Sequence, residues 1–155
     1  MIHLIDTGIL LRLVDVRDPD HTAVRQATQV LRVRGDQLVT APQNISEFWN
    51  VSTRPTTARG GAGRSVERTD RCVNFFQRIA TVLRDDPDVF PEWRQLVQLH
   101  QIQGVAVHDA RLVAFMKVWR ISHILTLNPA DFRRYPGLVI VSPSDVIAAK
   151  KDADQ

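Results

Sequence analysis

Four acidic residues of this 155-residue chain stand where a carboxylate could take part in chemistry. Asp6 directly follows the apolar stretch Ile2–Ile5, and Asp131 follows the apolar stretch 121–127 after a short gap. Glu47 stands among the apolar residues of a predicted helix, and Asp109 stands in the first turn of another. If these groups meet, each negative charge disfavours ionisation of the next, and a bound divalent cation is the natural compensation.

The residue types favour one kind of metal and one kind of reaction. Carboxylates are hard oxygen ligands, and a single cysteine, Cys72, excludes a cysteine-rich zinc site. We therefore expect Mg²⁺, with Mn²⁺ as a plausible substitute, completed by waters and a substrate phosphate. Such a site lowers the pKa of bound water and holds the attacking and leaving oxygens of a phosphodiester. The predicted chemistry is metal-dependent phosphodiester hydrolysis.

Each candidate also has a purely structural interpretation. Aspartate is a preferred helix N-cap, so Asp6 could simply cap the helix after it. Asp109 could stabilise its own helix through a cap or the helix dipole, an effect of about 1 kcal/mol. Glu47 could lie on the solvated face of its helix, which is the commonest place for a glutamate. The hydroxyls of Thr7 and Thr126 suit the orientation of a carboxylate or a water, but they could also serve as caps.

The basic residues suggest an anionic partner. The net charge is +3, and arginine, which can grip phosphate with two hydrogen bonds, far outnumbers lysine. Arg54, Arg59 and Arg64 lie in a glycine-rich stretch that we expect to be a mobile loop and the candidate contact to nucleic-acid phosphates. No Gly-Lys-Ser/Thr follows the glycines, which excludes a nucleotide P-loop. The alternative explanation for the arginines is a genomic bias toward that residue.

The elements that must position these residues follow an alternating pattern. Short apolar stretches alternate with longer helical patterns, which is typical of an α/β fold with a mainly parallel sheet. We predict a three-layer α/β/α sandwich with about five strands. Strand-to-helix turns of a parallel sheet lie at one edge, so the four carboxylates could face one cleft. The predicted strands are Ile2–Ile5, Gln37–Thr40, Ile79–Leu83, Ile121–Leu127 and Leu138–Val141; the predicted helices cover about 8–14, 21–34, 43–53, 65–78, 90–103, 108–119 and a short stretch after Ser142.

Length and composition predict one domain over residues 1–149 and a polar tail over residues 150–155. The start of the chain has no basic leader followed by a long apolar region, so we expect no signal peptide. No apolar run approaches the roughly 20 residues that span a bilayer. Together with the low cysteine content, these features favour a cytoplasmic protein without membrane attachment.

Four sequence motifs, in this order, closely resemble those of PIN-domain ribonucleases. Among these enzymes, the chain is most similar to the VapC toxins of bacterial type II toxin–antitoxin pairs. Each motif is weak alone, but the four occur in order at suitable spacing and cover nearly the whole chain. The motifs are Leu4-Ile5-Asp6-Thr7, Ser46-Glu47-Phe48, His108-Asp109-Ala110 and Leu125-Thr126-Leu127-Asn128-Pro129-Ala130-Asp131-Phe132.

The resemblance implies a Mg²⁺-dependent endoribonuclease that forms a homodimer and has a cognate antitoxin whose tail blocks the cleft. It makes Asp6 and Asp109 the main metal ligands and places Glu47 in the same acidic pocket. Family members often carry aspartate where Asn128 stands, so the nearby Asp131 is the candidate for the last acidic position. This departure leaves the number of metals open.

Two other classes of function remain at this stage. A non-catalytic PIN-like module would bind RNA or a partner; Asn128 favours it, whereas the acidic residues do not. A phosphotransfer protein on a similar sheet would need further residues. A receiver domain needs paired acids after the first strand, and an aspartyl-phosphate phosphatase needs an aspartate where Gly8 stands.

Overall fold

The computed structural model describes the backbone of residues 1–153 and the side chains up to Lys150. Its centre is a parallel sheet of five strands in the order β3-β2-β1-β4-β5. The central strand, β1, is the first apolar stretch of the chain, which the sequence predicts as a strand. The strands are β1 (Ile2–Ile5), β2 (Gln37–Thr40), β3 (Thr81–Val82), β4 (His123–Leu125) and β5 (Val139–Val141).

Helices connect the strands and cover both faces of the sheet. Helix α1 follows β1 directly and α3 follows β2 directly, so both begin at the carboxyl edge of the sheet. The helices are α1 (Thr7–Val14), α2 (His21–Val33), α3 (Pro42–Thr53), α4 (Val66–Ile79), α5 (Val89–Leu99), α6 (Ala106–Val118) and α7 (Pro143–Ala153), with a short 3₁₀ helix, η1 (Pro129–Asp131). In the described residues, no helix is long and apolar enough to cross a membrane.

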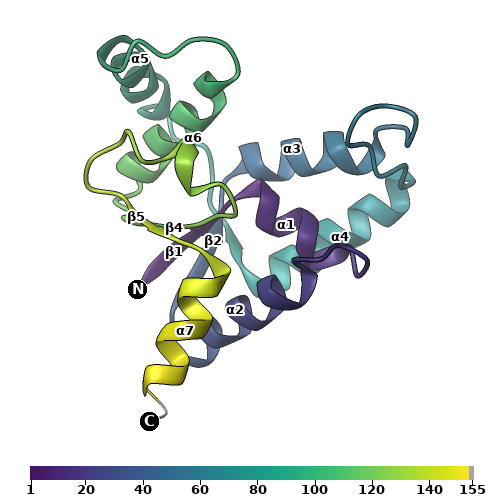
Figure 1. The fold of residues 1–155 in the computed structure, drawn as a ribbon. Helices are drawn as coiled ribbons and strands as arrows, with labels where there is room; N and C mark the ends of the chain where they lie inside the picture. Colours follow the sequence, from purple (N-terminus) through teal and green to yellow (C-terminus); the bar gives the residue numbers. More distant parts are fainter. Residues whose placement is uncertain (154–155) are drawn as a thin grey trace.

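Two apolar cores lie on opposite faces of the sheet because successive side chains of a strand point to opposite faces. Leu4 packs with α5 and α6, whereas Ile5 packs with α1, α2 and α4. Ile124 and Leu125 of β4 divide between the two cores in the same way. Figure 1 shows these layers, with α5 and α6 on one side of the sheet and α1, α2 and α7 on the other. The predicted three-layer sandwich is therefore confirmed.

Some boundaries differ from those predicted. Ile79 is the last residue of α4 rather than the start of a strand, and β3 shrinks to two residues. Helix α5 ends at Leu99 because the chain turns sharply at Gln101, which has a left-handed φ of 50°. The predicted polar tail begins inside α7, which continues to Ala153, and the last two residues of that tail lie outside the described residues.

The strand order reverses at one position along the carboxyl edge of the sheet. The chain runs outward from β1 through β2 to β3, then returns to the other side of β1 for β4 and β5. Ligands of open α/β sheets bind where the order reverses in this way. Here that point lies between β1 and β4, whose last residues, Ile5 and Leu125, are paired in register. The next residues along these strands, Asp6 and Thr126, therefore lie side by side.

Candidate active site

Asp6 occupies the point where the strand order reverses. Its backbone N–H donates to Leu125 O at 3.1 Å, which extends the pairing of β1 and β4 by one residue. Its carboxylate accepts from the Thr7 N–H at 2.7 Å and from the Thr126 hydroxyl at 2.7 Å. Asp6 is thus the N-cap of α1, one of the two interpretations left open above. Because each carboxylate oxygen accepts only one of these bonds, further lone pairs remain for a ligand.

Glu47 turns toward the sheet edge and not toward solvent. Its Oε2 accepts from the Thr7 hydroxyl at 2.6 Å, and its Oε1 accepts from Gln43 Nε2 at 2.8 Å. The fully buried Asn44 donates to the same Thr7 hydroxyl at 3.0 Å. Gln43 and Asn44 lie four and three residues before Glu47, so all three share one face of α3. The Thr7 hydroxyl therefore joins the two elements that carry Asp6 and Glu47.

Asp109 and Asp131 complete the group of carboxylates. Asp109 lies in the first turn of α6, but the N-cap of that helix is Val105, so Asp109 does not cap it. Asp131 is exposed on η1, after β4. Its negative charge raises the pKa values of both Asp109 and Asp6. The structure therefore brings all four predicted carboxylates to one site.

The electrostatics of the site disfavour negative charge. Burial is the main cause that raises the pKa of Asp6, and the charges of Glu47 and Asp131 add to it, while the Thr126 and Thr7 hydrogen bonds oppose it. Burial, followed by the charges of Asp131, Asp6 and Glu47, raises the pKa of Asp109 to about 6. Burial is the larger cause of both shifts, and repulsion between the carboxylates adds to it.

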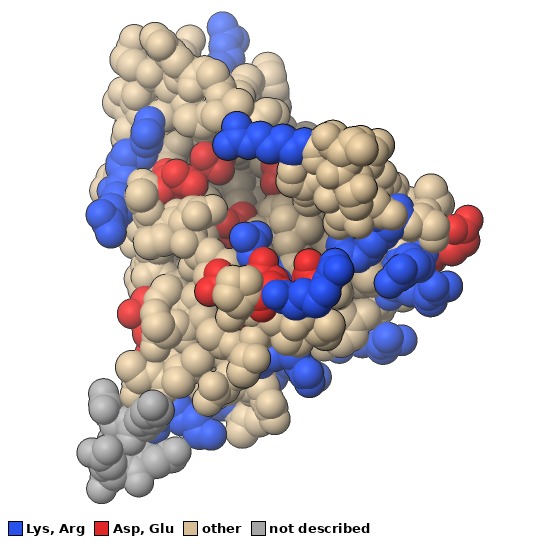
Figure 2. All heavy atoms as spheres, turned by 45° about the vertical axis from the view of Figure 1, so that its right-hand side comes forward, with Lys and Arg blue, Asp and Glu red and all other residues tan. Residues whose placement is uncertain are grey.

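No cationic side chain up to Lys150 pairs with these carboxylates, and His108, the smallest of the causes that act on Asp109, is the one that lowers its pKa. Among the described residues, no lysine, arginine or histidine lies within 4.0 Å of any of the four carboxylates. The donors around them are neutral hydroxyl, amide and backbone groups. Figure 2 shows acidic atoms gathered in a hollow on this face, with basic side chains along its rim.

The donor set fits magnesium better than a metal that needs a protein cage. No group of three or more His, Cys, Asp or Glu in the described part of the chain is arranged to hold a metal by itself. Mg²⁺ needs no such group, since it is commonly bound by one or two carboxylates and keeps several waters. Asp6 and Asp109, with raised pKa values and no cationic partner, offer those oxygens.

Three residues that hold the site together were not predicted from the sequence. Gln43 Nε2 donates to Glu47 and also to the His108 carbonyl at 2.9 Å, which ties α3 to the start of α6. Arg111 donates to Gln43 Oε1 at 2.9 Å and to Asp85 at 3.1 Å. Asn44 is the third. Helical spacing from Glu47 could have found Gln43 and Asn44, whereas Arg111 lies only two residues after Asp109 and no spacing marks it.

The other predicted residues divide between two places. The Asn128 backbone N–H donates to the Thr126 hydroxyl at 3.0 Å, so Asn128 lies next to the carboxylates. Arg54 and Arg64 line a separate pocket at the far ends of α1 and α3, whereas Arg59 does not. The site itself is thus acidic, and the basic residues lie beside it.

Comparison with known proteins gives one family match. The model of the PIN domain matches residues 3–138, which is most of the chain. No curated protein is similar enough in sequence to count as a relative.

Solved structures share the fold at low sequence identity. VapBC2 of Rickettsia felis, bound to a DNA fragment from its promoter, has a TM-score of 0.67 and 14% identity, and covers 92% of this chain and 98% of that chain. DNA-bound VapBC of Salmonella typhimurium has a TM-score of 0.66 and 17% identity, over 92% and 99% of the two chains. VapC20 of Mycobacterium tuberculosis, described as a toxin that cleaves the sarcin–ricin loop, has a TM-score of 0.57 and 16% identity, over 80% and 87%.

Proposed function

Because this chain belongs to the PIN-domain family, we propose that it is a magnesium-dependent endoribonuclease and the toxin of a type II toxin–antitoxin pair. One observation carries the proposal: four carboxylates share the point where the strand order reverses, and no cationic side chain in the described residues neutralises them. A divalent cation and the phosphate that it attracts would supply the missing positive charge and the substrate.

In this proposal the acidic residues divide the work. Asp6 and Asp109 would hold Mg²⁺, or Mn²⁺ in its place, and the bound metal would supply a water of lowered pKa and stabilise charge on the phosphodiester. Glu47 and Asp131 would accept hydrogen bonds from waters and orient one of them for attack. Thr7, Thr126 and Asn128 would support them, since the two hydroxyls already fix Glu47 and Asp6. Their hydrogen bonds leave the carboxylates little freedom to rotate, which keeps the site preorganised.

The partners follow from the same reasoning. Several structural neighbours are complexes of a toxin with its antitoxin, which supports an antitoxin partner for this chain. One neighbour is described as cleaving an RNA loop, which supports RNA as the substrate class. We further propose that the protein forms a homodimer and acts in the cytoplasm.

The direct test is cleavage of RNA by the purified protein. We expect cleavage with Mg²⁺, none after chelation with EDTA, and recovery when Mg²⁺ or Mn²⁺ is added back. Asp6→Asn keeps the size of the side chain but removes its charge, so it should lose at least about 100-fold in rate. If the wild type binds RNA without cutting it under any of these conditions, the chain is instead a non-catalytic PIN-like binding module.

A further inference from the structure

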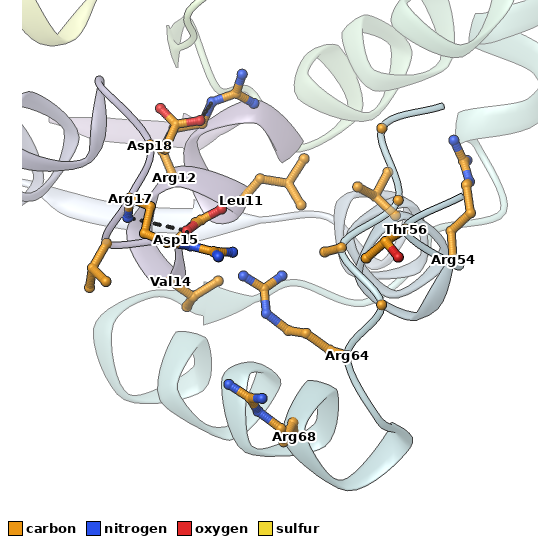
Figure 3. Close-up of a pocket in the computed structure, with 16 residues that line it drawn as sticks. Leu11, Arg12, Val14, Asp15, Arg17, Asp18, Arg54, Thr56, Arg64 and Arg68 are labelled. Atoms are coloured by element: carbon orange, nitrogen blue, oxygen red, sulfur yellow. Dashed lines mark hydrogen bonds and ion pairs between the residues drawn. The ribbon is translucent and has the colours of Figure 1, made fainter. Parts of the chain in front are cut away.

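A pocket of about 770 Å³ lies away from the carboxylates, between two walls. The end of α1 and the turn after it, residues 11–18, form one wall; the end of α3, the loop 54–64 and the start of α4 form the other. Five arginines and two aspartates line the pocket, with no lysine or histidine, so its lining carries a net charge of +3. Figure 3 shows the Arg17 and Arg64 guanidinium groups reaching from opposite walls into the space between them.

The two aspartates leave most of this positive charge unpaired. Asp18 pairs with Arg12 at 3.3 Å, and Asp15 pairs with Arg17 at 3.5 Å. Within the described residues, the remaining arginines, which are Arg54, Arg64 and Arg68, have no carboxylate within 4.0 Å. Like charges gathered without counter-charges raise the free energy of the folded chain, and an anion bound between them would lower it.

Hydrogen bonds hold two of these arginines in place. Arg54 donates to the Arg59 carbonyl at 2.9 Å, and Arg64 donates to the Ser52 hydroxyl at 3.4 Å. Ser52 is buried and accepts from the Thr69 hydroxyl at 3.0 Å, which ties α3 to α4. Each guanidinium keeps further N–H donors for a ligand, and its planar fork suits two oxygens of a phosphate.

The glycine-rich loop is shaped to build this wall. The sequence predicts a mobile segment, but the structure has a loop fastened by backbone hydrogen bonds, including Gly63 N to Arg54 O at 2.8 Å. A Cβ on Gly61 would lie only 2.1 Å from Pro55 O, so only glycine allows this close return of the chain. The glycines thus fold the loop back against α3 and place Arg54 and Arg64 in one wall.

Two helices connect this pocket to the acidic site. Helix α1 begins beside Asp6 and ends at the pocket, and α3 carries Glu47 and also ends there. At 1.5 Å per residue, the paths from Asp6 to Arg12 and from Glu47 to Arg54 are each about 10 Å. A nucleic-acid strand covers that distance within a few nucleotides, because even a stacked strand advances about 3.4 Å per phosphate.

We propose that this pocket, named the arginine pocket from here on, binds backbone phosphates of the single-stranded RNA next to the position that enters the acidic site. The proposal rests on the proposed function for its choice of ligand. RNA is favoured over an acidic peptide because the pocket continues along α1 and α3 toward a site suited to a phosphodiester. Arginines that contact backbone phosphates do not contact the bases. The arginine pocket would therefore increase the affinity for RNA and position the strand, but it would add little sequence preference.

Binding of a short fluorescent single-stranded RNA, measured by anisotropy in EDTA over a range of salt concentrations, tests the proposal without cleavage. Arg17→Gln/Arg64→Gln should weaken binding about tenfold. It should also reduce the slope of log affinity against log salt by about 0.7 for each phosphate that the variant no longer neutralises. The positional control is Arg94→Gln, which removes one positive charge on α5, over the other face of the sheet, and it should bind as the wild type does.

A second variant guards against misfolding. Arg68 is exposed and makes no side-chain ion pair in the described residues, so Arg68→Gln should fold normally and still lose affinity. Equal affinity and salt slope in the wild type and all pocket variants would overturn the proposal, as would loss of binding to an acidic peptide but not to RNA. If the pocket variants lose RNA binding while the wild type never cleaves RNA, the arginine pocket stands and the nuclease proposal fails.

Discussion

The hydroxyl of Thr126 donates to Oδ2 of Asp6 at 2.7 Å, although the two residues lie 120 positions apart in the chain. This bond crosses the point where β1 and β4 end side by side, and it is the leading cause that opposes the rise in the pKa of Asp6 from burial. Because β1 and β4 are neighbours in the sheet, Thr126 can reach Asp6 and favour its ionised form.

Loss of the Thr126 hydroxyl should shift the pH dependence of cleavage. Thr126→Val keeps the shape of the side chain but removes the hydrogen bond, so Asp6 should hold its proton to a higher pH. A hydrogen bond to a charged group contributes about 1.5–3 kcal/mol, which predicts a loss of about tenfold or more in kcat/KM near neutral pH. A pH–rate profile, whose acidic limb should move upward, checks this. Thr126→Ser keeps the hydroxyl and should retain the wild-type profile; a Val variant that also retains it would contradict the role given to this bond.

In the metal-free protein, the ionised Asp109 carboxylate should lower the free energy of unfolding at neutral pH. Its pKa is raised to about 6 by burial and by neighbouring carboxylates, so the folded state binds the proton more tightly than the unfolded chain does. Its contribution is therefore favourable below the unfolded pKa of about 3.9 and is lost as the pH rises through about 6. Asp109→Asn should raise the free energy of unfolding at pH 7 by about 1 kcal/mol, after allowance for partial exposure to solvent.

Denaturant unfolding of wild type and Asp109→Asn at several pH values, in EDTA, measures this difference. His3 titrates in the same range with the opposite sign, because burial lowers its pKa to about 4. That effect is common to both proteins and cancels when they are compared at each pH. An Asp109→Asn gain that is the same at pH 4 and pH 7 would show that the carboxyl is not strained in the folded state.

Loss of the Gln43 side chain should lower activity more than loss of the Asp85 charge, although Arg111 contacts both residues. Gln43→Leu removes one of the two hydrogen bonds to Glu47 and the bond to the His108 carbonyl, so we expect about a tenfold loss in kcat. Asp85→Asn removes only an exposed ion pair with Arg111, and such pairs contribute about 0–1 kcal/mol. Single-turnover cleavage rates of the two variants separate the contributions. Equal losses would mean that Gln43 acts only through the stability of the fold.

Glycine substitutions should separate the wall of the arginine pocket from the helix next to the acidic site. Gly61→Ala would press a methyl group against the carbonyls of Pro55 and Arg54, and we expect it to destabilise the fold by about 1–3 kcal/mol. A methyl at Gly8, inside α1, meets nothing within 4 Å, so Gly8→Ala should be neutral or stabilising by about 0.5–1 kcal/mol. Thermal unfolding of both variants provides the measurement, and a Gly61→Ala protein as stable as the wild type would refute the close return of the loop.

The sequence was sufficient to predict the layers and much of the site. The alternation of short apolar stretches and helical patterns identified the strands, and the rule that parallel strands share a carboxyl edge placed Asp6 near Asp131. The helix predicted from about residue 65 begins there, because the Ser65 hydroxyl accepts from the Arg68 backbone N–H at 3.2 Å and caps α4.

Tertiary contacts decided the features that the sequence left open. Glu47 faces the site because Thr7, from a different helix, offers it a hydroxyl, and no local pattern encodes that contact. Arg111 reaches across from α6 to α3, so its role depends on how two helices pack. The composition of the loop 54–64 predicts flexibility, yet its glycines permit the backbone hydrogen bonds that hold the loop against α3.

The central claim is that carboxylates distant in sequence form one site for a divalent cation, and calorimetric titration of the apo protein with Mn²⁺ tests it most directly. We predict a saturable binding isotherm for the wild type, the same isotherm for Asp70→Asn, an exposed control on α4, and its loss in Asp6→Asn/Asp109→Asn, with folding of each protein checked by circular dichroism. Mn²⁺ bound as tightly by the folded double variant as by the wild type would contradict the account.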